Sequence, residues 1–124
     1  MSKYSHLFSS IRIGRMKLKN RLVLAALNSK LGTENGAVSD RYIEFLVERA
    51  KGGVGLLIIE NTCVDWSLSR GGSNPIRADR VEFIPGLNDL VEAVHAHGAN
   101  VATQLQHVGS QANPLFTGGN PKPF

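Results

Sequence analysis

Gln104, Gln106 and His107 gather where an apolar run ends in the stretch VATQLQHVGSQ, which spans residues 101–111. Polar residues also follow two earlier apolar runs, with Asn28 after RLVLAAL and Glu60-Asn61 closing VGLLIIE. Asn and Gln side chains carry hydrogen-bond donors and acceptors without charge. They therefore suit a planar heterocycle that displays alternating carbonyl and N–H groups along one edge. The alternative is that these amides only satisfy backbone groups of the loops around them.

The three apolar runs, at 21–27, 54–60 and 100–106, predict strands buried on both faces. A helix is expected between the first two, with Ser39 or Asp40 as its N-cap and Gly52-Gly53 as its end. A second helix is expected to start near Pro85 and to close at Gly98. Residues 61–79 between the second strand and this helix are expected to form a long loop.

Strand, helix, strand, helix, strand is the pattern of parallel strands joined by right-handed crossovers. A doubly wound dinucleotide fold would carry a G-x-G-x-x-G turn after the first strand, and LAALNSKLG has none. The other architecture is an α/β (β/α)8 barrel, which typically needs about 250 residues. Only three of its strands fit in 124 residues, so we expect the amino-terminal part of a longer protein. In either architecture the strand ends form one site, which would fit a flavin or a pyrimidine.

A net charge of +4 and five cations in RIGRMKLKNR raise the question of nucleic-acid binding. The cations alternate with apolar residues on either side of Gly14-Arg15, as in a hairpin with one solvated face, and no aromatic residues are interleaved. We therefore expect no nucleic-acid partner. No segment reaches membrane-spanning length and no signal peptide is recognisable, so a cytoplasmic protein without a membrane partner is expected.

Metal sites and catalytic groups are not expected in this stretch. A single Cys63 excludes a cysteine-rich cluster, and His95 and His97, two positions apart on a helix, point in different directions and cannot chelate together. No carboxylate, tyrosine or cysteine stands out as a general acid or nucleophile. Trp66 and Arg70 in the long loop could line a substrate pocket or a subunit contact, or be an ordinary aromatic and a solvated cation.

Three motifs in order resemble the old yellow enzyme family, in the branch of NADH:flavin oxidoreductases and 2,4-dienoyl-CoA reductases. The motifs are LFSSIRIGRMKLKNRLVLAALNSK, ERAKGGVGLLIIENTCV and VHAHGANVATQLQHVGSQA, and the likeness covers residues 7–112. The resemblance implies a TIM barrel that holds FMN at the carboxyl ends of its strands. It also implies three segments: a hairpin lid that closes the barrel bottom at 1–19, three strands and two helices at 20–112, and a loop at 113–124.

The resemblance also implies site residues. Ala25, Ala26, Leu27 and Asn28 would lie along the flavin, with Asn28 near its O4 and N5 edge, although Ala26 stands where the family commonly has proline. Asn61 matches a position, often Ala or Gly, that approaches the ring through its backbone, and Gln104 matches the glutamine that pairs with the pyrimidine edge. His107 would belong to the substrate pocket, but Ser110 replaces the arginine of the family's H-x-G-R stretch.

The implied activity is transfer of hydride from NADH or NADPH through FMN to an activated alkene or enoyl thioester. Any iron–sulfur cluster would belong to a part of the protein beyond this stretch. A homo-oligomer is compatible with the resemblance. The alternative is a catalytically inactive fragment or an interaction module that lacks the rest of the barrel.

Overall fold

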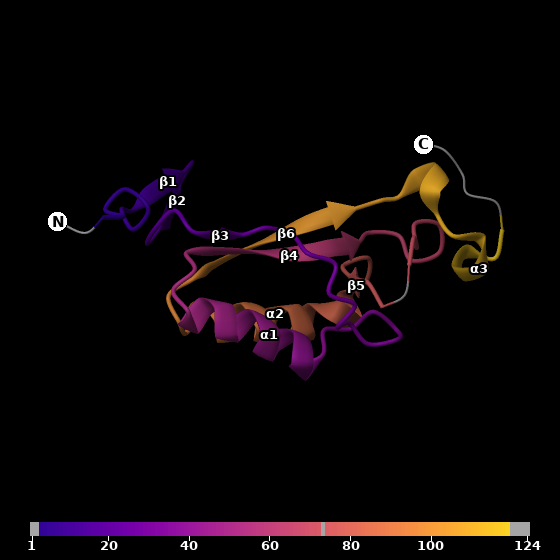
Figure 1. Ribbon diagram of the computed structural model, residues 1–124. Coiled ribbons are helices and arrows are strands. Elements are labelled where there is room, and N and C mark those ends of the chain that lie inside the picture. Colours follow the sequence, from indigo (N-terminus) through magenta and orange to yellow (C-terminus); the bar gives the residue numbers. More distant parts are fainter. Residues whose placement is uncertain (1–2, 73, 120–124) are drawn as a thin grey trace.

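The computed structural model describes residues 3–72 and 74–119. Its central sheet consists of β3 (Val23–Leu24), β4 (Leu56–Cys63) and β6 (Asn100–Gln106), with β4 paired in parallel to both neighbours. A short strand, β5 (Ile76–Arg77), also pairs in parallel with the end of β4. Figure 1 shows the helices α1 (Asp40–Lys51) and α2 (Ile84–His95) together below this sheet.

The helices begin and end for local reasons that the sequence contains. The Ser39 hydroxyl accepts a hydrogen bond from the Tyr42 backbone N–H, which confirms Ser39 as the N-cap of α1. Gly52 forms the C-cap of this helix. Pro85 lies in the first turn of α2, as expected, and a short 3-10 helix, η1 (Val81–Phe83), precedes it.

The core lies between the helices and one face of the sheet. Leu57 and Ile59 of β4 are fully buried there against Tyr42 and Leu46 of α1 and Leu90 of α2. Val101 of β6 packs against the same cluster. Because successive strand residues point to opposite faces, Ala102, Gln104 and Gln106 face away from the helices.

Several expected boundaries differ from the structure. The first core strand is only two residues long, because pairing with β4 stops after Leu24. The expected loop 61–79 contains the end of β4 and all of β5, which find backbone partners in each other. Within the expected loop 113–124, residues Pro114–Thr117 form α3, capped by the Asn113 side chain, and residues 120–124 lie outside the described part.

The expected hairpin is present as β1 (Ile11–Ile13) and β2 (Met16–Leu18), which pair antiparallel. Arg12 lies opposite Lys17, so the cations share one face, while Leu18 on the other face is fully buried. Figure 1 places this hairpin at the end of the sheet where the parallel strands begin. Among the described residues, no helix is both long enough and apolar enough to cross a membrane.

Candidate functional site

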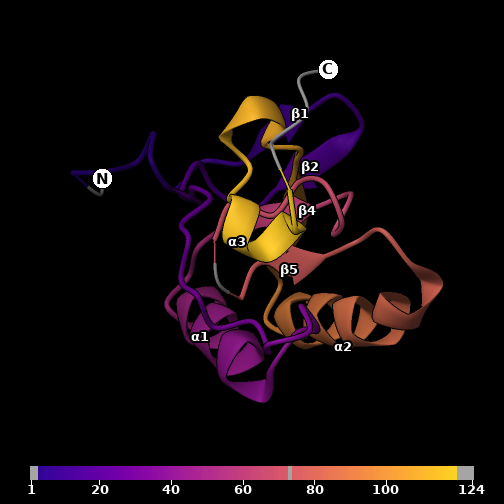
Figure 2. The ribbon, with the colours of Figure 1, turned by 90° about the vertical axis from the view of Figure 1, so that its right-hand side faces the viewer.

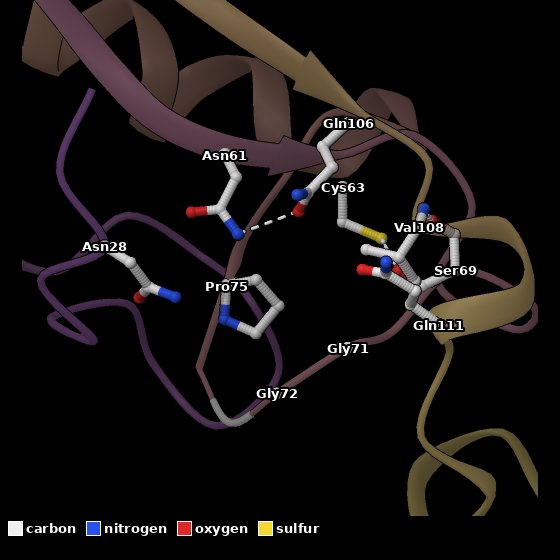
Figure 3. A pocket seen from close by; sticks show the side chains of 10 residues that line it. All are labelled: Asn28, Asn61, Cys63, Ser69, Gly71, Gly72, Pro75, Gln106, Val108 and Gln111. Atoms are coloured by element: carbon white, nitrogen blue, oxygen red, sulfur yellow. Dashed lines mark hydrogen bonds between the residues drawn. The ribbon is translucent and has the colours of Figure 1, made fainter. Parts of the chain in front are cut away.

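A cavity of about 220 Å³ lies at the carboxyl ends of the parallel strands. Figure 3 shows Asn28, Asn61 and Gln106 around one part of it, with Ser69 and Gln111 on the opposite side. The remaining lining residues are Cys63, Gly71, Gly72, Pro75 and Val108. None of these side chains is charged, so the cavity offers neutral hydrogen-bonding groups only.

The cavity brings together two of the predicted site residues, Asn28 and Asn61. Gln104 does not line it, but strand alternation places this glutamine on the same face of β6 as Gln106. Its side chain is exposed, and it makes no hydrogen bond within the described part of the chain. His107, the residue after β6, is partly buried. Its Nδ1 accepts a hydrogen bond from the Gly109 N–H at 3.1 Å.

The segment after β3 carries the other predicted residues. Ala25 and Leu27 are exposed and Ala26 is half-buried, as expected for an extended segment that alternates. Glu60 anchors this segment, because its Oε2 accepts a hydrogen bond from the Ser29 backbone N–H. Glu60 is only 1% exposed, and its Oε1 has no hydrogen-bond partner among the described residues. The carboxylate thus holds the residue next to Asn28.

An irregularity in β4 determines which side chains reach the cavity. Ile59 pairs with Thr103, but Thr62 pairs with Leu105, so β4 contains one residue more than β6 in this interval. This is the pattern of a β-bulge. Beyond it, Thr62 lies on the same face as Thr103, with 2.7 Å between their hydroxyl oxygens. Asn61 therefore faces the cavity, where its Nδ2 donates to Gln106 Oε1 at 2.8 Å.

The loop after β4 is held by a column of alternating aromatic rings and guanidinium groups. Arg77 lies 4.5 Å from the Phe83 ring and 4.4 Å from the Trp66 ring. Arg70 lies 4.1 Å from the same Trp66 ring and 4.5 Å from the Phe116 ring. We call these five residues the aromatic–arginine column. Such contacts stabilise a structure by about 0.5–2 kcal/mol each.

The same column is fixed by a buried ion pair at its base. Arg77 binds both carboxylate oxygens of Asp79, with Nε and Nη2 each 2.8 Å from an oxygen. This double hydrogen bond holds the pKa of Asp79 below its usual range. Neither Trp66 nor Arg70 lines the cavity, and Arg70 is stacked rather than freely solvated.

Two further contacts join the loop after β4 to the loop after β6. The Val108 backbone N–H donates to Ser69 Oγ at 2.7 Å, and the Asn113 N–H donates to the Arg70 carbonyl at 3.0 Å. A Cβ on Gly71 would lie 3.2 Å from a methyl group of Val108, so this close approach favours glycine. The wall of the cavity is therefore one unit built from two loops.

Cys63 is a buried thiol at the back of the cavity. Burial is the main cause that raises its pKa, and its Sγ lies 3.7 Å from the Ser69 carbonyl oxygen that accepts its hydrogen bond. A thiol held protonated in this way is a poor nucleophile. Cys63 thus contributes packing to the site.

Sequence reasoning missed Gln106, Ser69 and Gln111 as lining residues. The signal for Gln106 was present, because residues two apart on a strand share a face and Gln104 was already assigned. Ser69 and Gln111 carried no comparable signal, because their positions depend on how two loops meet.

The residues present fit a planar, uncharged, hydrogen-bonding group such as a flavin ring. Asn28 and Gln104 lie at the ends of β3 and β6, and within the described part of the chain neither amide has a partner. Figure 1 shows α1 and α2 on the lower side of the sheet, and strand alternation directs Gln104 to the upper side.

A family model described as the NADH:flavin oxidoreductase / NADH oxidase family matches residues 6–116. The chain belongs to this family. An NADH oxidase from Thermoanaerobacter brockii is 40% identical over 119 residues, which are 96% of this chain and 18% of that protein. This member of the NADH:flavin oxidoreductase family therefore spans less than a fifth of that relative.

Solved structures confirm the family resemblance and the fold. A 2-naphthoyl-CoA reductase in complex with 2-naphthoyl-CoA matches with a TM-score of 0.86 and 32% identity, over 94% of this chain and 18% of that one. Old Yellow Enzyme from Pichia sp. matches with a TM-score of 0.82 and 28% identity, over 88% of this chain and 28% of that one. The expected fold, the amino-terminal part of an old yellow enzyme TIM barrel, is confirmed.

Proposed function

We propose that this chain forms part of the flavin-binding mouth of an FMN-dependent NAD(P)H oxidoreductase. One observation carries the proposal: in a member of the NADH:flavin oxidoreductase family, unpaired amides and an uncharged cavity lie together at the carboxyl ends of the parallel strands. Ligands of parallel barrels bind at this end. Bound FMN would supply hydride transfer from NADH or NADPH to an activated alkene or enoyl thioester.

Each predicted residue has a specific role in this proposal. The Gln104 amide pairs with the pyrimidine edge of the ring, and Asn28 donates a hydrogen bond near its O4 and N5 edge. A donor at that edge stabilises the electron-rich reduced ring, so Asn28 raises the reduction potential. Ala25, Ala26 and Leu27 lie along the ring, Asn61 contributes through its backbone, and His107 borders the substrate. The proposal needs no iron–sulfur ligand from this stretch, whose only cysteine is Cys63.

The test is Gln104→Leu in the flavoprotein that carries this chain. Loss of two neutral hydrogen bonds at about 0.5–1.5 kcal/mol each is expected to weaken FMN binding by roughly tenfold or more. FMN affinity is measured by titrating the apoprotein and following quenching of flavin fluorescence. The control is Asn88→Leu, because the Asn88 amide donates to Glu92 at 3.0 Å on α2 and lies outside the cavity lining, so this variant should retain FMN.

Unchanged FMN affinity and reduction potential in Gln104→Leu would contradict the assignment of this glutamine. Failure of the unmodified protein to bind FMN would contradict the proposed function itself. That second result would support the alternative, an inactive piece or interaction module.

A further inference from the structure

Asn28 lines the cavity from a segment that has already left the sheet. Pairing of β3 with β4 ends at Leu24, so residues 25–28 lie beyond the ladder. Among the described residues, the first backbone hydrogen bond after Leu24 runs from the Ser29 N–H to Glu60 Oε2. We propose that Glu60 is a positioning residue that fixes Asn28 against the flavin and thereby helps to set its reduction potential. This inference rests on the proposed function, because it concerns the flavin contact of Asn28.

The backbone of Glu60 is itself held in place by the core. Its N–H donates to the Tyr42 hydroxyl oxygen at 3.1 Å, and its carbonyl oxygen accepts a hydrogen bond from the Thr62 hydroxyl at 2.8 Å. Tyr42 and Thr62 are both fully buried. The Glu60 side chain therefore starts from a rigid position in the sheet, and its carboxylate holds the Ser29 N–H at a defined place.

The turn that Ser29 begins needs such an anchor. Lys30 has a φ of +58°, in the left-handed region that side chains other than glycine rarely adopt. Ser29 Oγ accepts a hydrogen bond from the Leu31 N–H at 3.2 Å, and the Leu31 carbonyl accepts one from the Ser39 hydroxyl. Strained backbone persists only where its surroundings fix it. Glu60 supplies the anchor on the side of the cavity, and Ser39 supplies the anchor on the side of α1.

The burial of Glu60 also favours a role beyond stability. A carboxylate that leaves water loses its hydration, and a buried apolar side chain of similar size avoids that cost. An apolar residue would, however, leave the Ser29 N–H without its acceptor. The position of Ser29 determines that of Asn28, because a rigid peptide unit joins the two residues. Loss of the acceptor is therefore expected to weaken the contact of Asn28 with the reduced ring and to lower the reduction potential.

The test separates the acceptor of Glu60 from its charge. Glu60→Gln and Glu60→Leu both remove the charge, but only glutamine keeps an oxygen that can accept from Ser29. The reduction potential of FMN bound to the flavoprotein is measured by spectroelectrochemistry. In Glu60→Leu, loss of one neutral hydrogen bond should lower the ratio of reduced to oxidised FMN affinity about threefold to tenfold relative to Glu60→Gln. A tenfold change corresponds to about 30 mV for a two-electron couple.

Glu60→Asp gives a second contrast, which keeps the charge. Its side chain is one methylene shorter, so the carboxylate is withdrawn from the Ser29 N–H and the potential should fall below that of the unmodified protein. This comparison decides the question if Glu60→Leu does not fold. Hydrogen-exchange mass spectrometry reports the bond directly: residues 25–31 should exchange faster in Glu60→Leu and Glu60→Asp than in Glu60→Gln.

Asn28→Leu shows whether the effect acts through this asparagine. In the Asn28→Leu background, Glu60→Leu and Glu60→Gln should have equal potentials, because no amide remains to be positioned. A difference that persists there would mean that Glu60 acts on the ring by another route, and it would overturn the inference.

Thr33 supplies a matched control in the same loop. Its Oγ1 accepts a hydrogen bond from the Ala37 N–H at 2.8 Å, and it lies outside the cavity lining. Thr33→Val removes that acceptor and should leave the reduction potential unchanged. A fall as large as that in Glu60→Leu would mean that any loosening of this loop lowers the potential, which would also overturn the inference.

Failure of this inference can be told apart from failure of the proposed function. An unmodified protein that does not bind FMN contradicts the proposed function. A potential that is unchanged in Asn28→Leu contradicts the flavin contact of Asn28, and this inference with it. Equal potentials in Glu60→Gln and Glu60→Leu, together with a lower potential in Asn28→Leu, contradict this inference alone.

Discussion

At the scale of single residues, the Tyr42 hydroxyl accepts the hydrogen bond of a backbone N–H at the bulge in β4. The register shift between Ile59 and Thr62 interrupts the backbone ladder, and the Glu60 N–H there donates to the Tyr42 oxygen at 3.1 Å. Tyr42 is 1% exposed, so its phenol is held away from water. A side chain of the core thus completes the backbone of the site.

Replacing Tyr42 with phenylalanine should leave the buried Glu60 N–H without a partner. An unsatisfied buried donor costs about 1–3 kcal/mol, so the free energy of unfolding should fall by that amount. Urea unfolding of the flavoprotein at pH 7, followed by far-UV circular dichroism, measures the change. A free energy of unfolding equal to that of the unmodified protein would show that the hydroxyl is not needed there.

Stability should also fall at alkaline pH because of this phenol. Burial is the main cause that raises the pKa of Tyr42 from 10.0 to about 12. Above pH 10 the unfolded chain releases this proton before the folded chain does, so stability is complete below pH 10 and is lost progressively up to about pH 12. The loss is on the order of 2 kcal/mol. Urea unfolding at pH 9 and pH 11 should show it, and Tyr42→Phe should show a smaller alkaline loss.

Sequence predicted single residues well where one local rule decided them. Ser39 or Asp40 was expected as the N-cap of α1, and Ser39 forms it, because its hydroxyl accepts the hydrogen bond of the Tyr42 N–H. The Asn61–Gln106 bond could not be predicted, because the two residues are 45 positions apart and meet only through the register of β4 and β6. The flavin contacts of Gln104 and Asn28 stay predictions.

At the scale of elements, the aromatic–arginine column connects β5, the loop after β4 and α3. Arg70 connects the loop to α3, because it contacts the Trp66 ring on one side and the Phe116 ring on the other. The expected long loop at 61–79 therefore behaves as an ordered wall. Composition pointed to a loop because Gly and Pro are frequent there, but it could not reveal the stacking that orders it.

Arg70→Met should loosen this wall without removing any lining residue. We expect faster hydrogen exchange in residues 64–72 and 113–117, and a KM for substrate raised about three- to tenfold with kcat changed less, because lost contacts of about 0.5–1 kcal/mol each act on the cavity shape. Hydrogen-exchange mass spectrometry and steady-state kinetics measure both. Arg70→Lys, which keeps the charge, should restore part of the effect. An unaltered exchange rate would contradict the role of the column.

Gly36 makes room for the same column. Its φ is +86°, and a Cβ there would lie 2.4 Å from carbon atoms of the Arg77 side chain and 2.9 Å from the Trp66 ring. Gly36→Ala should therefore lower the free energy of unfolding by about 2–4 kcal/mol, from backbone strain plus overlap. Gly53→Ala is the matched control, because φ is +98° but the space around it is open. Thermal unfolding of both variants separates the two causes, and equal losses would exclude the overlap.

At the scale of the whole molecule, three strands and two helices leave one sheet face and the end of β6 uncovered. Leu105 is 63% exposed, on the face of β6 that Val101 directs toward the helices. The parallel order of the strands was predictable, because buried apolar runs alternating with amphipathic helices allow few topologies. The short length of β3 was not predictable, because it depends on which residues of β4 form backbone hydrogen bonds with it.

Residues 1–124 produced alone should bind FMN weakly or not at all. The candidate ring contacts come from only three strands, and among the described residues no cation lines the cavity to hold the FMN phosphate. Titration of the purified polypeptide with FMN, followed by fluorescence quenching, gives the dissociation constant. Tight, stoichiometric quenching would contradict this expectation and would mean that three strands suffice for the flavin site.

Because of the bulge in β4, alternation of residues along this strand does not predict which side chains face the cavity. Ile58 and Asn61 share a face although they are three positions apart, because the strand gains one residue between Ile59 and Thr62. Deletion of one residue at 60 or 61 would restore strict alternation and leave Thr62 paired with Leu105 and Cys63 paired with Gln106, so the faces of both side chains would not change. When relatives are aligned, a gap of a single residue at this point would therefore keep the same residues toward a ligand and the same residues toward the core on either side of it.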